Sequence, residues 1–318
     1  MTRTTRLTAT MLDDAARFLW TSGRVLEQRR FAHLFGTEPD PAGVLAALVA
    51  HRCADGGFAF GIEPDVRGPV PQPIAVPTAL LAMEEAGALD EARAWPVCDW
   101  LARVAAPDGG VPVVLPSLRP YPRPPFLPVP EDGAKPVGEL LATGQIVAPL
   151  LRQGIEHPWL TAATAFCRTA VDELGATHPY EVGAALRFLD ALHSLSSAPE
   201  TAWARSSAAR LGALVREQRI VLLDPARPEE ARTAPGYAPG EHPLPHDYAR
   251  TPDSLARGWF TDEELARSLD HLVAAQQPDG GWPINWARWS ATTESEARPG
   301  VTVQALITLR AYDNASGA

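Results

Sequence analysis

Apolar residues recur at helical spacing along most of this 318-residue chain, and the helical stretches follow one another in pairs. The pattern predicts helices over 11–31, 41–52, 77–86, 92–104, 160–174, 180–192, 202–216, 262–275 and 301–312. We therefore expect an all-α fold of about ten to twelve helices that are joined as hairpins.

A short turn sequence, Asp-Gly-Gly, occurs three times, beginning at Asp55, Asp108 and Asp279. Each copy follows a predicted helix, and glycine after a helix end supplies the left-handed residue that closes the last turn. Gly57 and Gly281 are the candidates for this positive-φ position. Since the third copy lies about three repeat lengths after the second, two unmarked repeats fit between them. We expect the three turns to have equivalent geometry.

The repeats extend over residues 1–318 without a break in composition, which predicts a single repeat domain. Two proline-rich segments, 112–136 and 224–252, interrupt it. Proline removes a backbone donor and restricts the preceding residue, so neither segment is expected to be helical. Long loops inside a compact domain often bind ligands, and an inert wrap around the rim of the fold is the alternative for these two segments.

The segment at 276–282, Gln-x-x-Asp-Gly-Gly-Trp, resembles the QW repeat of squalene–hopene cyclases. The segment at 55–58, Asp-Gly-Gly-Phe, is similar to the repeat of protein prenyltransferase β subunits. This resemblance implies an α/α toroid of inner and outer helices around a central cavity. It also implies an isoprenoid-type enzyme, a terpene cyclase or prenyl transferase, that acts on a hydrophobic small molecule.

The catalytic motifs of both families are absent from this chain. It has no Asp-x-Asp-Asp motif, whose central acid protonates an alkene or epoxide in the cyclases. It has no Asp-x-Cys pair of the kind that holds zinc in the prenyltransferases. Only the repeat residues carry over from the resemblance, and their implied role is structural.

Charge and composition narrow the choice of partners. A net charge of −10 and a pI near 5.3 disfavour nucleic acid, whose binding needs a basic surface. No apolar run is long enough to span a membrane, and residues 1–10 are polar, so a cytoplasmic location is predicted. Three widely spaced cysteines indicate reduced thiols. Oligomeric state and cofactor are left undetermined.

The connection over 53–76 holds the best candidate chemistry, because it is much longer than a helix hairpin needs. It contains Glu63, Asp65, Arg67 and Gln72 at the point where a toroid would have its cavity mouth. Desolvation of a carboxyl group raises its pKa and suits it to act as a general acid. We predict Asp65 as the acid and Glu63 as its partner, with Arg67 and Gln72 contacting substrate; a structural pairing of the carboxylates with Arg67 is the alternative.

Aromatic and histidine residues supply further candidate substrate contacts, because π faces stabilise carbocations. The aromatic candidates are Phe60 in the first connection and Trp286 and Trp289 near the last repeat. His246 and the adjacent Asp247, in the second proline-rich segment, are further predicted substrate contacts. Prolines between His242 and His246 remove the helical spacing that a metal pair would use, so no metal site is predicted.

Two other function classes stay open. In a carbohydrate-active toroid, Glu63 and Asp65 would act with Asp247 or Asp253 as paired carboxylates. In a non-catalytic binding protein, the repeat would remain without chemistry. A cavity lined by apolar side chains and one acid would favour the isoprenoid enzyme.

Overall fold

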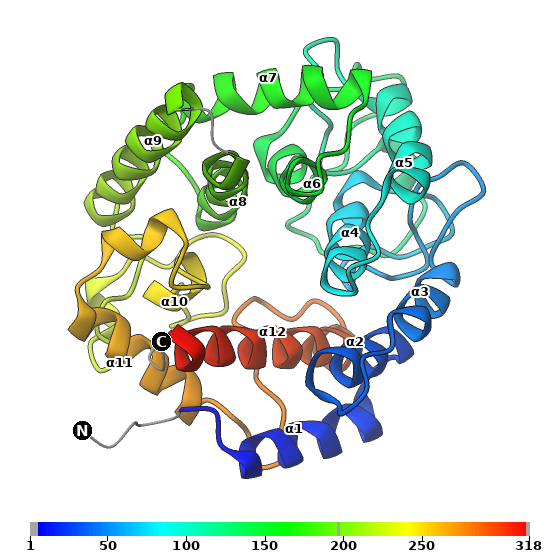
Figure 1. Cartoon of the computed structure of the whole chain (residues 1–318). Coiled ribbons are helices and arrows are strands. Elements are labelled where there is room, and N and C mark those ends of the chain that lie inside the picture. Colours follow the sequence, from blue (N-terminus) through cyan, green and yellow to red (C-terminus); the bar gives the residue numbers. More distant parts are fainter. Residues whose placement is uncertain (1–5, 196–197, 316–318) are drawn as a thin grey trace. The chain divides into compact units, whose positions relative to one another are not determined.

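Helices make up nearly all the regular structure in the computed structural model, which describes residues 6–195 and 198–315 (Figure 1). Within those ranges there is no strand, and two isolated bridges pair Arg52 with Phe58 and Tyr237 with Trp286. The helices are α1 (Ala9–Ser22), α2 (Val25–Phe35), α3 (Pro41–Val49), α4 (Val76–Glu85), α5 (Glu91–Val104), α6 (Leu140–Arg152), α7 (Pro158–Glu173), α8 (Pro179–Leu195), α9 (Ala198–Glu217), α10 (Pro245–Tyr248), α11 (Asp262–Ala274) and α12 (Thr293–Ala315).

Most of the expected helices are present, with three differences. The expected helix over 11–31 is two helices, because the chain turns to extended backbone at Gly23, where a Cβ would lie 2.6 Å from Leu19 O. α6 was not predicted. The expected absence of helix over 224–252 is wrong at α10, where Pro245 occupies the first helical position and loses no needed hydrogen bond.

The described residues fall into two compact units, one made of Met1–Phe31 with Ala208–Ala318 and the other of Ala32–Ser207. In the Ala32–Ser207 unit, α4, α6 and α8 form one layer, and α3, α5 and α7 form a second layer (Figure 1). α6 and α8 are buried around most of their circumference, as expected for helices packed on several sides. The single domain expected over 1–318 stays a prediction.

The other unit joins the two ends of the chain. Asp313 of α12 accepts hydrogen bonds from the backbone N–H groups of Arg6 and Leu7 at 2.9 and 2.8 Å. The side chain of Arg6 forms an ion pair with Asp270 of α11 at 3.1 Å. These two N–H groups precede α1, and the carboxylate of Asp313 supplies a hydrogen-bond acceptor for each of them.

The three Asp-Gly-Gly turns have the same hydrogen bonds, so the expectation of equivalent geometry is confirmed. The second glycine donates its N–H to Oδ1 of its own aspartate at 3.1, 3.0 and 3.0 Å. The carbonyl of the same glycine accepts a hydrogen bond of 2.8 Å in each turn. The donor is the backbone N–H of the residue two positions before the aspartate, which is Cys53, Ala106 or Gln277.

Each turn also packs on another helix through its two glycines. A Cβ on the first glycine would lie 2.0–2.5 Å from a backbone atom of α5, α7 or α1. A Cβ on the second would lie within 2.9 Å of an aromatic ring one helical turn further along the same helix. These rings belong to Trp100, Phe166 and Phe18.

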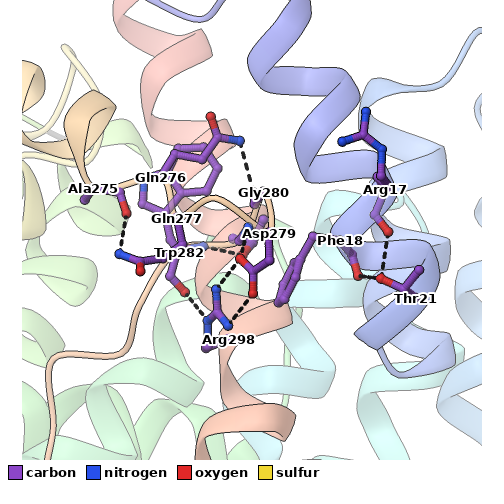
Figure 2. A network of polar contacts seen from close by, with 12 residues as sticks. Arg17, Phe18, Thr21, Ala275, Gln276, Gln277, Asp279, Gly280, Trp282 and Arg298 are labelled. Atoms are coloured by element: carbon purple, nitrogen blue, oxygen red, sulfur yellow. Dashed lines mark hydrogen bonds and ion pairs between the residues drawn. The ribbon is translucent and has the colours of Figure 1, made fainter.

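The Asp279 turn carries the most polar contacts (Figure 2). Arg298 donates to both oxygens of Asp279, at 2.8 and 2.7 Å, and its guanidinium lies 4.7 Å from the ring centre of Phe18. The side-chain N–H of Gln276 donates to Met11 O at 3.0 Å, and Trp282 Nε1 donates to Leu272 O at 2.7 Å. The turn thus fixes α11 against α1, and hydrogen bonding holds the pKa of Asp279 below its usual value.

The expected positive φ at Gly57 and Gly281 is wrong. The left-handed residue is the first glycine of each turn, with φ of 99° at Gly56, 92° at Gly109 and 93° at Gly280. Gly57 and Gly281 are constrained instead by the rings against them.

Gly280→Ala is therefore expected to lower the free energy of unfolding by more than about 2 kcal/mol, because it combines left-handed strain with a close backbone contact. Gly240→Ala is the matched control, since Gly240 has φ of 81° and no heavy atom lies within 4 Å of the position that a Cβ would take there. It should cost only about 1 kcal/mol. Denaturant unfolding measures both, and equal losses would contradict the docking role of the turn.

Candidate functional site

The 53–76 connection, where the sequence places the acid, is a loop of the Ala32–Ser207 unit with backbone hydrogen bonds of its own. The backbone N–H of Gln72 donates to Phe58 O at 3.1 Å, and the N–H of Phe60 donates to Gly68 O at 3.1 Å. Gly68 has φ of 102° and lies against the ring of Tyr121, which a Cβ at Gly68 would meet at 2.5 Å. The loop is thus folded back on itself and packed on the first proline-rich segment.

The side chain of Gln72 joins this loop to the first proline-rich segment. Its side chain is fully buried, its Nε2 donates to Ser117 Oγ at 3.1 Å, and its Oε1 accepts the N–H of Leu115 at 2.7 Å. A buried amide bonded from both ends holds two segments together. The side chain of Gln72 thus has a structural role here, and a contact of Gln72 with substrate stays a prediction.

Phe60 is the strained residue of the loop. It has φ of 55°, which is uncommon for a bulky residue, and 50% of its side chain is exposed. Its carbonyl lies 3.1 Å from His51 Nδ1. Strain of this kind persists only where the surrounding structure enforces it, and it is found often at binding sites.

The structure brings Glu63, Asp65 and Arg67 together in one turn between Phe60 and Gly68. All three side chains are half-buried, and the N–H of Val66 donates to Glu63 O at 3.1 Å. Carboxylates and a guanidinium in one half-buried turn are the set that the sequence singled out. Their use as catalytic groups stays a prediction.

The remaining predicted residues lie in the other unit, around α10. His246 is buried, and its Nδ1 is 2.7 Å from Ser268 Oγ of α11, which also accepts the backbone N–H of His246 at 3.0 Å. Burial lowers the pKa of His246, and the neighbouring Asp247 carboxylate offsets only part of this effect. His246 is therefore a neutral imidazole at pH 7.

Asp247 stabilises the single turn of α10. Its Oδ2 accepts the N–H of Leu244 at 2.8 Å, and its Oδ1 lies 3.9 Å from His246 Nε2. Tyr248 donates its hydroxyl to Ile220 O at 2.8 Å. Both hydrogen bonds hold the short helix in place.

Trp286 and Trp289 are half-buried in the segment before α12. Trp286 bridges to Tyr237, with flanking hydrogen bonds from Ala238 N to Asn285 O at 3.1 Å and from Ala287 N to Gly236 O at 2.9 Å. This short antiparallel pairing connects the second proline-rich segment to the last repeat.

Sequence reasoning missed Arg250, which follows α10 and is half-buried beside Asp247. No repeat or motif marks it. Tyr237, Asp247, Arg250, His246 and Trp286 are called the α10 cluster below. Apart from Trp289, the predicted residues therefore form two groups, the 53–76 loop and the α10 cluster, each within its own unit.

The cysteines offer no nucleophile at neutral pH. Burial raises the pKa of Cys98 to about 12, and burial followed by the Asp55 charge raises the pKa of Cys53. Burial shifts the pKa of Cys167 in the same direction. The thiols thus stay protonated, and the thiolate is the reactive form.

Comparison with solved structures identifies the fold. The type II terpene cyclase MstE from Scytonema matches with a TM-score of 0.54 and 14% identity, over 96% of this chain and 97% of that one, in a complex with merosterolic acid A as product. A second MstE structure, with geranylgeranyl dihydroxybenzoate as substrate, matches at 0.53 and 14% over 97% of each chain. A crystal structure of a protein from Actinoplanes matches at 0.56 and 17%, over 95% of this chain and 98% of that one.

The chain has the fold of a type II terpene cyclase. The all-α, α/α-toroid fold class expected from the sequence is therefore confirmed. No protein-family model matches the chain, and no curated protein matches it. The specific link to the squalene–hopene repeat remains a resemblance in sequence. Among the described residues, none of the helices combines the length and apolar character needed to cross a bilayer.

The lowered pKa of His246 predicts acid sensitivity. The unfolded chain takes up the proton first as pH falls, so this contribution to stability is complete above the unfolded value of about 6.5 and is lost below it. His246→Asn should flatten the decline of the melting temperature between about pH 7.5 and pH 5. An identical decline in both proteins would show that His246 is not the responsible group.

Proposed function

We propose that this protein is a terpene-cyclase-type enzyme that acts on a hydrophobic isoprenoid and starts the reaction by protonation. The observation that carries the proposal is the likeness to type II terpene cyclase structures over at least 95% of both chains. One of those structures holds a geranylgeranyl substrate and another holds a product. At 13–14% identity the likeness establishes the fold, and the chemistry proposed here rests on this chain's own residues.

Asp65 is our proposed acid. It would transfer its carboxyl proton to a carbon–carbon double bond, which leaves a carbocation on the substrate and a carboxylate on the enzyme. Ring closure moves the cation along the chain, and loss of a proton ends the sequence, so the product is an isomer of the substrate. This chemistry needs no redox cofactor.

The surroundings of Asp65 support this role in two ways. Glu63 and Arg67 lie with it in one half-buried turn, where a carboxyl group is partly withdrawn from water. Phe60 presents an exposed ring on the same loop, and a π face can stabilise a cation by about 0.5–2 kcal/mol.

A binding protein without catalysis is the second candidate function. The absence of both the Asp-x-Asp-Asp motif and the Asp-x-Cys pair favours it. Such a protein would bind the same hydrophobic ligand without turnover. A cytoplasmic location remains a prediction from the sequence.

Asp65→Asn should reduce turnover of a geranylgeranyl substrate at least about a hundredfold, because the amide keeps the size of the side chain and loses the transferable proton. Gas chromatography with mass spectrometry measures product formation. Thermal melting should be nearly unchanged, and Glu63→Gln should have a smaller effect on turnover.

Asp132→Asn provides the matched control, because Asp132 is an exposed carboxylate of the first proline-rich segment. It should turn over substrate at the parent rate. If Asp65→Asn also kept the parent rate, Asp65 would not be the acid. If the parent protein bound the substrate and left it unchanged, the binding-protein function would stand instead.

A further inference from the structure

Arg250 is a half-buried cation, and no carboxylate among the described residues of its unit contacts its guanidinium. Its Nε donates to the backbone carbonyl of Asp247 at 3.2 Å. In the part of the chain that the structure describes, no carboxylate lies within ion-pair distance of its guanidinium. A guanidinium has donors on both Nη atoms besides Nε, so most of its hydrogen-bonding capacity remains available.

The electrostatic setting of Arg250 is that of a group partly withdrawn from water. Burial lowers the pKa of Arg250, while the nearby Asp247 carboxylate and Tyr237 phenol act in the opposite direction. Asp247 therefore offsets part of the positive charge without contacting it, and its Oδ2 is already bonded to the N–H of Leu244. Desolvation strengthens the attraction between such a cation and an anionic ligand.

Two buried side-chain nitrogen atoms have no hydrogen-bond partner among the described residues. They lie in the second proline-rich segment and in the segment before α12, which the Tyr237–Trp286 pairing joins. Trp286 Nε1 is buried and donates to no acceptor within residues 6–195 and 198–315. His242 is 4% exposed, and its Nδ1 is likewise without a partner there. A buried donor left without an acceptor costs about 1–3 kcal/mol, which a ligand oxygen would recover.

The short antiparallel pairing connects these groups. Tyr237 and Trp286 are opposed between flanking hydrogen bonds, the arrangement in which paired side chains lie closest and on one face. The Tyr237 phenol also acts to raise the pKa of Arg250. Tyr237 is thus paired with Trp286 and also favours the positive charge of Arg250.

We propose that the α10 cluster binds the anionic head group of a ligand with an apolar tail, and that Arg250 is its main donor. The head group is a carboxylate or a phosphate, because the guanidinium fork matches the oxygens of either. Tyr237 and Trp286 supply ring surface beside the head group. The apolar tail rests on the proposed function, whereas the preference for an anion rests on Arg250.

Equilibrium binding of farnesoic acid, farnesyl monophosphate and neutral farnesol, followed by tryptophan fluorescence, tests this proposal. The parent protein should bind at least one anion about tenfold or more tightly than the alcohol. Arg250→Gln should remove that preference and leave farnesol binding unchanged. The tighter of the two anions identifies the head group.

Arg205→Gln is the control, because Arg205 is an exposed arginine of α9. It should keep the parent preference. Arg250→Lys retains the charge and loses the fork, so it should reduce the preference several-fold; it also provides the test if Arg250→Gln does not fold.

Equal binding of anions and alcohol by the parent protein would overturn the head-group proposal and leave the proposed function standing. A parent-like preference in Arg250→Gln or in Arg250→Lys would do the same. Failure of all three ligands to bind would overturn both the head-group proposal and the proposed function.

Discussion

The close approach of a turn glycine to the backbone of another helix is the contact on which the helical packing depends. A Cβ at Gly56, Gly109 or Gly280 would lie within 2.5 Å of that backbone, so only glycine allows the approach. The aspartate before it satisfies the N–H of the following glycine, and the helix against which the turn packs supplies an aromatic ring. At Gly280 this contact fixes α11 on α1 and, together with Asp313, joins the two ends of the chain.

Each candidate group contains residues that come soon after such a turn. The 53–76 loop follows the Asp55 turn, and the segment with Trp286 follows the Asp279 turn. Because each turn is docked by glycine and ring contacts, the residues after it start from a rigid anchor. The loops can then depart from regular structure, as the left-handed Phe60 and the Tyr237–Trp286 pairing show. Rigid anchoring of irregular loops is a common way to build a binding site.

Sequence periodicity and the repeated turns predicted the helical fold and most helix positions, because an amphipathic period and a helix-ending glycine are local signals. The rest depends on contacts between distant residues. Which glycine is left-handed was not predictable, since the choice depends on the backbone of α5, α7 or α1. The structural place of Gln72 depends on Ser117 and Leu115, far along the chain. Arg250 belongs to no sequence motif. Only the structure singles it out, through its half-buried position beside Asp247.

The most direct test of the central claim, protonation-initiated cyclisation, is the reaction of the parent protein with a geranylgeranyl substrate in D₂O. Protonation of a double bond from an acid that exchanges with solvent places one deuterium on carbon in the product. We predict a cyclic isomer of the substrate that is one mass unit heavier when formed in D₂O than when formed in H₂O. A product without carbon-bound deuterium, or complete recovery of bound but unchanged substrate, would contradict the account.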